Sequence, residues 1–311
     1  MGHRVVHGGS RFSASALIDD ALIAEVTELV PLAPLHNPAN LEGIRVARRL
    51  FPDLPQVAVF DTAFHQSLPP QAYTYAVPLA WLEDHGIRRY GFHGTSHAFV
   101  SHETARLLER DPAETNTIVL HLGDGCSAAA VRGGRSVETS MGLTPLEGLV
   151  MGTRSGDLDP AIPAYLMREV RMSAEDIDQA LNSASGLKGL AGENDFRELE
   201  RLRASGDEHA GLAFDVYCHR IRKYVGAYYA VLETVDAVVF TAGVGEHSAA
   251  VRAASLNGLE RLGICVDGDR NNEPATGARR ISTDDSEVAV FVVPTNEEWQ
   301  IAREALGVVR A

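Results

Sequence analysis

Several polar residues stand where a chain could bind and transfer a phosphate group. A tight turn, Gly123-Asp124-Gly125, follows an apolar strand that ends at His121, and a second Gly-rich turn comes after Val131. Glycines let backbone N–H groups approach an anion because no Cβ stands in the way. Further along, Arg154 lies in a Gly-rich loop, where a guanidinium suits a phosphoryl group in transit. Gly-rich hairpin turns often serve only to reverse the chain, so the phosphate interpretation depends on residues elsewhere.

A second set of candidates stands near the ends of other predicted strands. Asp61 comes directly after the buried strand Val57–Phe60, where α/β proteins place catalytic groups, although a turn or cap residue would also fit there. His93 lies between glycines just before a predicted helix, where it could meet an anion or be structural. Arg4 and His7 could be functional, but their position alone favours charges that protect a sheet edge.

Apolar patterns place these candidates on short strands and longer helices. Short apolar runs predict strands at Val57–Phe60, Ile87–Phe92, Ala237–Phe240 and Val288–Val293, and helical spacing predicts helices at Ser13–Val30, Leu41–Phe51 and Leu212–Leu232. The strand at 237–240 runs into Gly243-Val244-Gly245 and then a helix. That order is found at nucleotide sites, although a lone Gly-x-Gly is a weak signal.

The composition limits the classes of protein. The chain has 311 residues, 45% hydrophobic and 23% charged, as in a soluble globular protein with room for two domains. Its net charge of −14 argues against a general nucleic-acid binder. Cys126, Cys218 and Cys265 lack metal-ligand spacing and indicate free thiols in a reducing, cytoplasmic setting. No apolar run approaches the roughly 20 residues of a membrane span, and no signal peptide is recognised.

Taken together, blocks along the chain resemble the acetokinase family, the acetate kinases of the sugar kinase/Hsp70/actin superfamily. The matching blocks are HRVVHGG at 3–9, LAPLHNP at 32–38, VFDTAFHQ at 59–66, YGFHGTSH at 90–97, HLGDG at 121–125, ETSMGLTPLEGLVMGTR at 138–154, NDFR at 194–197, VFTAGVGE at 239–246 and PTNEE at 294–298. They keep the family's order over the whole chain, so the resemblance is specific.

The resemblance implies an α/β fold of two RNase-H-like domains around a cleft. Residues 1–61 with 297–311 would form the first domain, and 62–296 the second, which would bind nucleotide and dimerise. The implied reaction is reversible, Mg²⁺-dependent phosphoryl transfer from ATP to acetate, giving acetyl phosphate and ADP by direct in-line transfer. The aromatic helix at 212–232 is compatible with the homodimers of the family.

The resemblance also implies a role for each matching residue. Catalysis would depend on Arg4, Asp61, His93 and Arg154, the acetate site on Arg4, Val6, Leu35, His36, Phe92 and Pro145, and Mg²⁺ on Glu297. The nucleotide site would comprise His121, Leu122, Gly123, Asp124, Gly125, Asp195, Phe196, Arg197, Gly243, Val244, Gly245 and His247. Two arginines, a histidine and Mg²⁺ would neutralise charge on the phosphoryl oxygens. Because acetate is already ionised, Asp61 would orient a metal-bound water or an arginine instead of taking a proton.

The chain departs from the family at its start and at two site positions. Family members begin with a strand and an Asn-x-Gly-Ser-Ser-Ser loop that have no counterpart before Met1, so the first domain is expected to be N-terminally incomplete. Either the start is assigned too late or the gene is a remnant; a chain truly beginning here would expose a strand edge and apolar surface and have little activity. Asp124 and His247 replace the family's usual Asn residues, which leaves nucleotide preference open. A carboxylate at 124 would repel phosphates unless Mg²⁺ or a proton intervenes.

Three functions follow from this comparison. The leading one is acetate kinase, favoured by the presence of Arg4, Asp61, His93, Arg154 and Glu297. The second is a truncated, catalytically weak or inactive relative that still binds nucleotide. The third is propionate kinase, since one methylene in a pocket is worth only ~1–3 kcal/mol.

Overall fold

The computed structural model describes residues 1–34 and 36–310, which form two compact units. The first comprises Met1–Thr115, Ala129–Pro145 and Thr295–Ala311, and the second Asn116–Ala128 and Leu146–Pro294. These units do not divide at residue 61, where the family resemblance places the domain boundary. The boundary at residue 61 separates the two RNase-H-like domains that the resemblance implies, and it stays a prediction.

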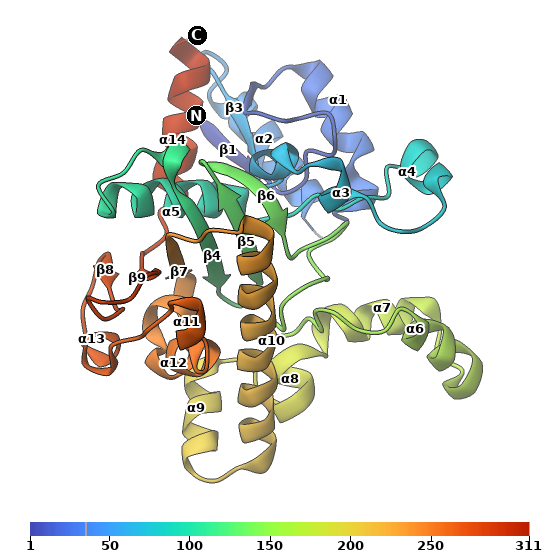
Figure 1. Ribbon diagram of the computed structural model, residues 1–311. Helices are drawn as coiled ribbons and strands as arrows, with labels where there is room; N and C mark the ends of the chain where they lie inside the picture. The colour runs from blue at the N-terminus through green and yellow to red at the C-terminus, as the bar shows by residue number, and fades with distance from the viewer. Residues whose placement is uncertain (35, 311) are drawn as a thin grey trace. The chain divides into compact units, whose positions relative to one another are not determined.

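The first unit carries the strands β1 (Gly2–Val5), β2 (Ala16–Leu17), β3 (Val57–Phe60) and β6 (Arg135–Thr139), and most of β5 (Cys126–Arg132). Its helices are α1 (Asp20–Glu28), α2 (Asn37–Leu50), α3 (Pro70–Tyr73), α4 (Leu79–His85), α5 (Gly94–Leu107) and α14 (Glu297–Arg310) (Figure 1). Short 3-10 helices lie at Val30–Leu32, Ala63–Ser67 and Pro112–Glu114.

Strand β3 is the centre of a three-stranded sheet, with β1 parallel on one side and β2 antiparallel on the other. Its side chains alternate between the two faces, as the pleat of a strand requires. Ala58 and Phe60 join the core formed with α1 and α2, whereas Val57 and Val59 pack with Ala305 of α14. Helices on both faces explain why a run of four apolar residues forms this strand.

One helix prediction for this unit is wrong in part. The helix expected at Ser13–Val30 begins only at Asp20. Ala16 and Leu17 instead pair with β3, so a contact with a strand distant in sequence overrides the local helical spacing. The predictions of a helix at Leu41–Phe51 and of a strand at Val57–Phe60 are confirmed within one turn.

The strand expected at residues 87–92 is absent from the described part of the chain. The segment is instead held by single contacts, because the N–H groups of Tyr90 and Gly91 both approach the carbonyl oxygen of Gly142, at 3.0 and 3.4 Å. An apolar run this short does not distinguish a strand from a buried loop.

The second unit carries β4 (Asn116–Leu122), β7 (Ala237–Thr241), β8 (Arg279–Arg280), β9 (Ala289–Val292) and the first residues of β5. Its helices are α6 (Ala161–Tyr165), α7 (Ala174–Ser183), α8 (Gly186–Ala191), α9 (Phe196–Ala204), α10 (Glu208–Leu232), α11 (Ala242–His247), α12 (Ala249–Leu256) and α13 (Gly268–Asn272), with a π-helical turn at Leu166–Val170 and a 3-10 helix at Glu260–Leu262. Figure 1 shows α8 and α9 beside the long helix α10. The strands predicted at 237–240 and 288–293 and the helix at 212–232 are confirmed.

Strands β4, β7 and β9 run parallel and are almost completely buried. Their carboxyl ends therefore reach one edge of the sheet, where β4 leads into the Gly123–Gly125 turn and β7 leads into α11. In open α/β sheets this edge is where ligands bind. None of the described helices is long and apolar enough to cross a membrane.

Arg252 of α12 is a buried arginine that joins three helices of the second unit. Its guanidinium Nη1 donates to the carbonyl oxygens of Gly245 and Glu246, both at 3.0 Å, in the last turn of α11. Nε and Nη2 donate to the side-chain and backbone oxygens of Asn271 on α13, both at 2.7 Å. Burial lowers the pKa of Arg252 to about 10, so the group stays charged at neutral pH.

We expect Arg252→Met to lower the free energy of unfolding by about 3 kcal/mol or more, because buried acceptors lose their donor. Arg252→Lys keeps the charge without the planar fork and should lose about half as much. Urea denaturation measures both, with Arg106→Met at an exposed arginine of α5 as the control. Equal, small losses for Arg252→Met and the control would contradict the prediction.

Candidate active site

An ion pair between Arg4 and Asp61 occupies the ends of β1 and β3. The parallel register sets Val5 opposite Phe60, which brings Arg4 close to the residue that follows β3. Arg4 Nη2 donates to Asp61 Oδ2 at 2.6 Å, and Nε lies 3.0 Å from both carboxylate oxygens. The Asp61 side chain is 1% exposed and that of Arg4 42%, so the pair hides the carboxylate and presents the guanidinium.

A second carboxylate approaches the same arginine. Glu297, the first residue of α14, places Oε2 3.7 Å from Arg4 Nη1. The charge of Asp61 raises the pKa of Arg4, while burial raises the pKa of the Asp61 and Glu297 carboxyl groups against the pull of Arg4. Arg4 is therefore a permanent cation whose direction is set by its partners.

His93 begins α5 in a left-handed backbone conformation, with φ of 56°. The neighbouring Gly94 N–H donates to the carbonyl oxygen of Asp61 at 2.9 Å, and a Cβ on Gly94 would clash with that oxygen. Gly91 also has a positive φ, 77°, and a Cβ there would lie 2.8 Å from the His65 ring. A left-handed backbone conformation costs a non-glycine residue about 1–2 kcal/mol. Such residues concentrate at functional sites. The flanking glycines thus hold His93 beside the Asp61 turn.

His65 supports this segment through two hydrogen bonds. Its Nε2 donates to the Phe92 carbonyl oxygen at 3.0 Å, so Nδ1 accepts from the Ser136 hydroxyl at 2.8 Å. Burial lowers the pKa of His65 to about 4, which keeps the ring neutral near pH 7. His65 lies within the motif block at 59–66, but the sequence gives it no role, because nothing in the chain marks a partner as distant as Ser136.

The other residues expected for the acetate pocket have simpler surroundings. Val6 and Phe92 are buried, and Pro145 is half-buried. His36 precedes α2 and is near enough to Asp61 to lower the pKa of that carboxyl. Leu35 lies outside the described residues.

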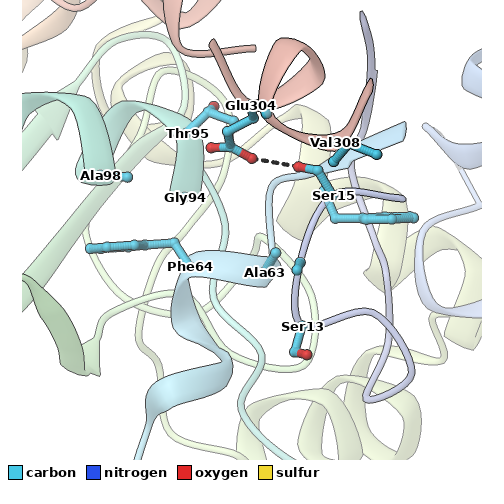
Figure 2. Close-up of a pocket in the computed structure, with 12 residues that line it drawn as sticks. Ser13, Ser15, Ala63, Phe64, Gly94, Thr95, Ala98, Glu304 and Val308 are labelled. Carbon is cyan, nitrogen blue, oxygen red and sulfur yellow. Dashed lines mark hydrogen bonds between the residues drawn. The ribbon is translucent and has the colours of Figure 1, made fainter. Parts of the chain in front are cut away.

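A separate cavity of about 380 Å³ lies within the first unit (Figure 2). Its wall comes from residues 13–15, the 3-10 turn at Ala63–Ser67, the start of α5 and the last turns of α14, and Ser15 Oγ donates to Glu304 Oε2 at 2.5 Å. None of the described residues predicted for catalysis or binding lines it. It is therefore distinct from the candidate site.

A larger cavity of about 550 Å³ lies in the second unit, at the carboxyl ends of β4 and β7. The predicted nucleotide residues that line it are Gly123, Asp124, Asp195, Phe196, Arg197, Gly243, Val244 and His247. It is also lined by Gly152 and Asn194, which lie in the motif blocks without a predicted role, and by Leu187, Glu200 and Ser248, which lie outside those blocks. An apolar wall with a few polar groups and a volume of this size is typical of a small-molecule pocket.

Four predicted nucleotide residues do not line this cavity: His121, Leu122, Gly125 and Gly245. Leu122 is completely buried and His121 nearly so. A Cβ on Gly245 would meet the backbone of Phe240, so this glycine allows α11 to lie close to β7. His121 and Leu122 are the last residues of β4, and Gly245 lies in α11, so they belong to the elements that lead to the cavity.

The turn after β4 presents backbone donors. The Gly123 N–H donates to Gly125 O at 3.1 Å, and the Asp124 carbonyl accepts from the Gly152 N–H at 2.9 Å. In the described part of the chain, the N–H groups of Asp124 and Gly125 have no acceptor. Successive N–H groups of this kind form a concave site for an anion.

Arg197 lines this cavity, whereas Arg154, the arginine predicted for the phosphoryl group, does not. Arg154 is half-buried; burial lowers the pKa of its guanidinium, while the charge of Asp124 opposes that shift. Asp195 caps α9, and its carboxylate accepts from Arg197 Nη2 at 2.7 Å, a bond that lowers the pKa of Asp195 to about 2. The exposed Asp195–Arg197 pair forms part of the rim.

No group of three or more His, Cys, Asp or Glu side chains among the described residues could hold a metal ion alone. Mg²⁺ is usually bound by one or two carboxylates together with substrate phosphates. Glu297, a partly buried carboxylate of the first unit, therefore fits a cation that arrives with a polyphosphate.

Comparison with known proteins identifies the class of this fold. The crystal structure of Porphyromonas gingivalis acetate kinase matches it with a TM-score of 0.95 and 45% identity, over 99% of this chain and 77% of that one. A propionate kinase from Francisella tularensis matches with a TM-score of 0.93 and 48% identity, over 97% and 77% of the two chains. The α/β fold of this class of kinases, expected from the sequence, is confirmed.

Sequence comparison gives the family. A family model described as the Acetokinase family matches residues 1–303. The acetate kinases of Streptomyces avermitilis and Streptomyces coelicolor are 60% and 62% identical over 309 residues, 99% of this chain and 76% of each relative. The chain belongs to the acetokinase family, a family of phosphotransferases, as the sequence motifs predicted.

We expect Arg4→Met to make the stability depend on pH. Without the guanidinium, the pKa of the buried Asp61 carboxyl rises further above its unfolded value, so the folded state binds the proton more tightly. The free energy of unfolding should then fall as the pH rises above about 4, with a loss of about 3 kcal/mol at neutral pH.

Urea denaturation from about pH 4 to about pH 7 measures this slope. The double variant Arg4→Met/Asp61→Asn lacks the Asp61 carboxyl, so it should lose this decline and its profile should run closer to that of wild type. A pH-independent loss in the single variant would show that Arg4 does not stabilise the Asp61 charge.

Proposed function

We propose that this chain transfers the γ-phosphoryl group of ATP to acetate, reversibly, giving ADP and acetyl phosphate. An acetate oxygen forms the new bond to phosphorus, and the bond between γ-phosphorus and the bridging oxygen breaks, so that ADP leaves with the electron pair. The observation that carries the proposal is the Arg4 guanidinium, presented by buried Asp61, in a chain 60% identical to an acetate kinase.

The first unit would bind the carboxylate substrate. Arg4 offers donors to an anion, while Asp61 fixes its direction and needs to take no proton, because acetate is ionised at neutral pH. Val6, Phe92 and Pro145, with Leu35, are the proposed apolar surroundings of the methyl group, and His36 a further active-site residue. His93, held in its left-handed conformation, is the proposed donor to the phosphoryl oxygens.

The second unit would bind the nucleotide. The N–H groups of the Gly123–Gly125 turn are proposed for the phosphates, and Arg154 for the charge that develops on the transferred phosphoryl group. Leu187, Phe196 and Val244 supply an apolar wall for a base. Asp195, Arg197 and His247 provide polar groups for the nucleoside; His121, Leu122 and Gly245 support them from behind.

We infer that Mg²⁺ accompanies the nucleotide and that Glu297 is the carboxylate associated with it. The charge of the ion would neutralise phosphate oxygens that otherwise repel acetate. Burial raises the pKa of the Glu297 carboxyl, and Arg4, 3.7 Å away, opposes that rise and directs the group.

Propionate is a second candidate substrate. The propionate kinase that matches the fold is 48% identical to this chain. Because one methylene is worth only about 1–3 kcal/mol, a small adjustment of the apolar pocket would change the preference.

We further propose a cytoplasmic homodimer. Exposed apolar side chains gather on α6 and the following π-helical turn: Ile162, Tyr165, Met167 and Val170. Such a group of exposed apolar side chains on one segment supports contact with a second copy. The free thiols of Cys126, Cys218 and Cys265 support a reducing compartment.

The direct test measures acetyl phosphate, trapped as the hydroxamate, from acetate and MgATP. Arg154→Ala should lower kcat about 10³-fold or more, because transition-state charge loses its partner. Arg106→Ala, at an exposed arginine paired with Glu103, should leave kcat unchanged. No turnover by folded wild-type protein that still binds ADP would replace this proposal with the non-catalytic nucleotide-binding alternative.

A second test concerns Asp124, whose carboxylate lines the cavity. It should repel metal-free ADP, so Asp124→Asn is expected to bind metal-free ADP about tenfold more tightly, which corresponds to about 1.4 kcal/mol. The change for MgADP should be smaller, because the cation offsets the carboxylate. Calorimetry with and without a chelator measures both, with Asp178→Asn on the exposed face of α7 as control. Unchanged affinity for metal-free ADP would place the phosphates away from Asp124.

A further inference from the structure

We propose that Cys126 is a positioning residue that holds the Gly123–Gly125 turn in the orientation needed to bind nucleotide phosphates. The inference rests on the proposed function, because it concerns the turn assigned to those phosphates. It stands on a buried chain of hydrogen bonds that joins the turn to Tyr217 of α10.

The chain of hydrogen bonds has one consistent arrangement of protons. Cys126 Sγ lies 3.2 Å from the Gly123 carbonyl oxygen and 3.2 Å from the Tyr217 hydroxyl. A carbonyl oxygen accepts only, so the thiol donates its proton to Gly123. The sulfur is then the acceptor for the Tyr217 hydroxyl.

This arrangement persists over the ordinary pH range. Both side chains are completely or almost completely buried. Burial raises the pKa of Cys126 to about 12 and holds the pKa of Tyr217 well above its usual value, although Arg154 draws the thiol in the opposite direction. Neither group loses the proton that it donates.

The consequence for the turn follows from peptide geometry. The Gly123 carbonyl and the Asp124 N–H belong to one trans peptide, so they point in opposite directions. A carbonyl oxygen held inward by the Cys126 thiol therefore turns the Asp124 N–H outward, on the turn that lines the cavity. If this peptide flipped, a carbonyl oxygen would replace the N–H and repel a phosphate.

The same contacts reach the apolar wall of the cavity. The Tyr217 ring lies 5.3 Å from the ring of Phe196, measured between centroids, and Phe196 lines the cavity. Cys126 thus connects the proposed phosphate turn with the wall proposed for the base. A residue that only filled space would not require a donor at this position.

The second unit offers a matched control. Cys218 is also a buried cysteine, and it neighbours Tyr217 on α10. Cys218→Ala removes the same atoms as Cys126→Ala from a similarly buried place, but it leaves the bond to Gly123 intact. Cys126→Ser keeps a hydrogen-bond donor, so it tests whether a donor at this position restores the ADP affinity lost in Cys126→Ala.

The experiment measures the dissociation constant of MgADP by calorimetry on the full chain, after circular dichroism has shown each variant folded. Cys126→Ala should weaken binding about tenfold, the value of one hydrogen bond of about 1.4 kcal/mol. Cys126→Ser should stay within about threefold of wild type, and Cys218→Ala should bind as wild type. The KM for acetate should not change in any variant, because the proposed acetate residues lie in the first unit.

Equal affinities for Cys126→Ala and Cys218→Ala would overturn the inference and leave the proposed function standing. Wild-type protein that does not bind MgADP would overturn both. If Cys126→Ala does not fold, Tyr217→Phe decides, since it removes only the hydroxyl that fixes the sulfur. An ADP affinity unchanged in Tyr217→Phe would then reject the chain of hydrogen bonds.

Discussion

The burial of the Asp61 carboxylate depends on the counter-charge of Arg4, and the first unit is arranged to keep the two together. Parallel pairing of β1 with β3 brings Arg4 to the end of β3, and α14 adds Glu297 to the far side of the guanidinium. The Asp61 carbonyl in turn accepts the Gly94 N–H, which sets where α5 begins. The Arg4 guanidinium, which would otherwise be mobile at the surface, is thereby held in one orientation. The opposing free-energy term is the removal of the Asp61 carboxylate from water.

The second unit also fixes the orientation of hydrogen-bond donors, but with neutral groups. Its donors are backbone N–H groups of a glycine turn, and their direction depends on the buried thiol and hydroxyl behind them. Both units also begin a helix with a left-handed non-glycine residue, His93 before α5 and Ala242 at the start of α11, with φ of 65°. Such a conformation persists only where the surrounding structure enforces it. His93 is constrained by the Gly94–Asp61 hydrogen bond, and Ala242 directly follows the buried strand β7.

Much of this could be predicted from the sequence because the relevant information is local. The Gly-rich turns, the buried run at 57–60 and the motif blocks each occupy a few consecutive residues, and they correctly indicated β3 and the family. Eight of the residues predicted for the nucleotide also line one cavity. The rest depends on distant partners. The pairing of Ala16 and Leu17 with β3, the contact of His65 with Ser136, and that of Cys126 with Tyr217 join residues far apart in the chain. Local spacing carries no trace of such contacts, so it predicts a helix that begins too early, at Ser13, and does not identify the supporting residues.

Arg252 holds α11 through the carbonyl oxygens of Gly245 and Glu246 and through Asn271, with no bond to the side chain at 247. Helix α11, which borders the cavity, is therefore held in place independently of the His247 side chain, which lines the cavity. A substitution at position 247 can be tried by mutation without first endangering the fold. The side chain proposed to meet the nucleoside can therefore change while the helix that carries it stays in place.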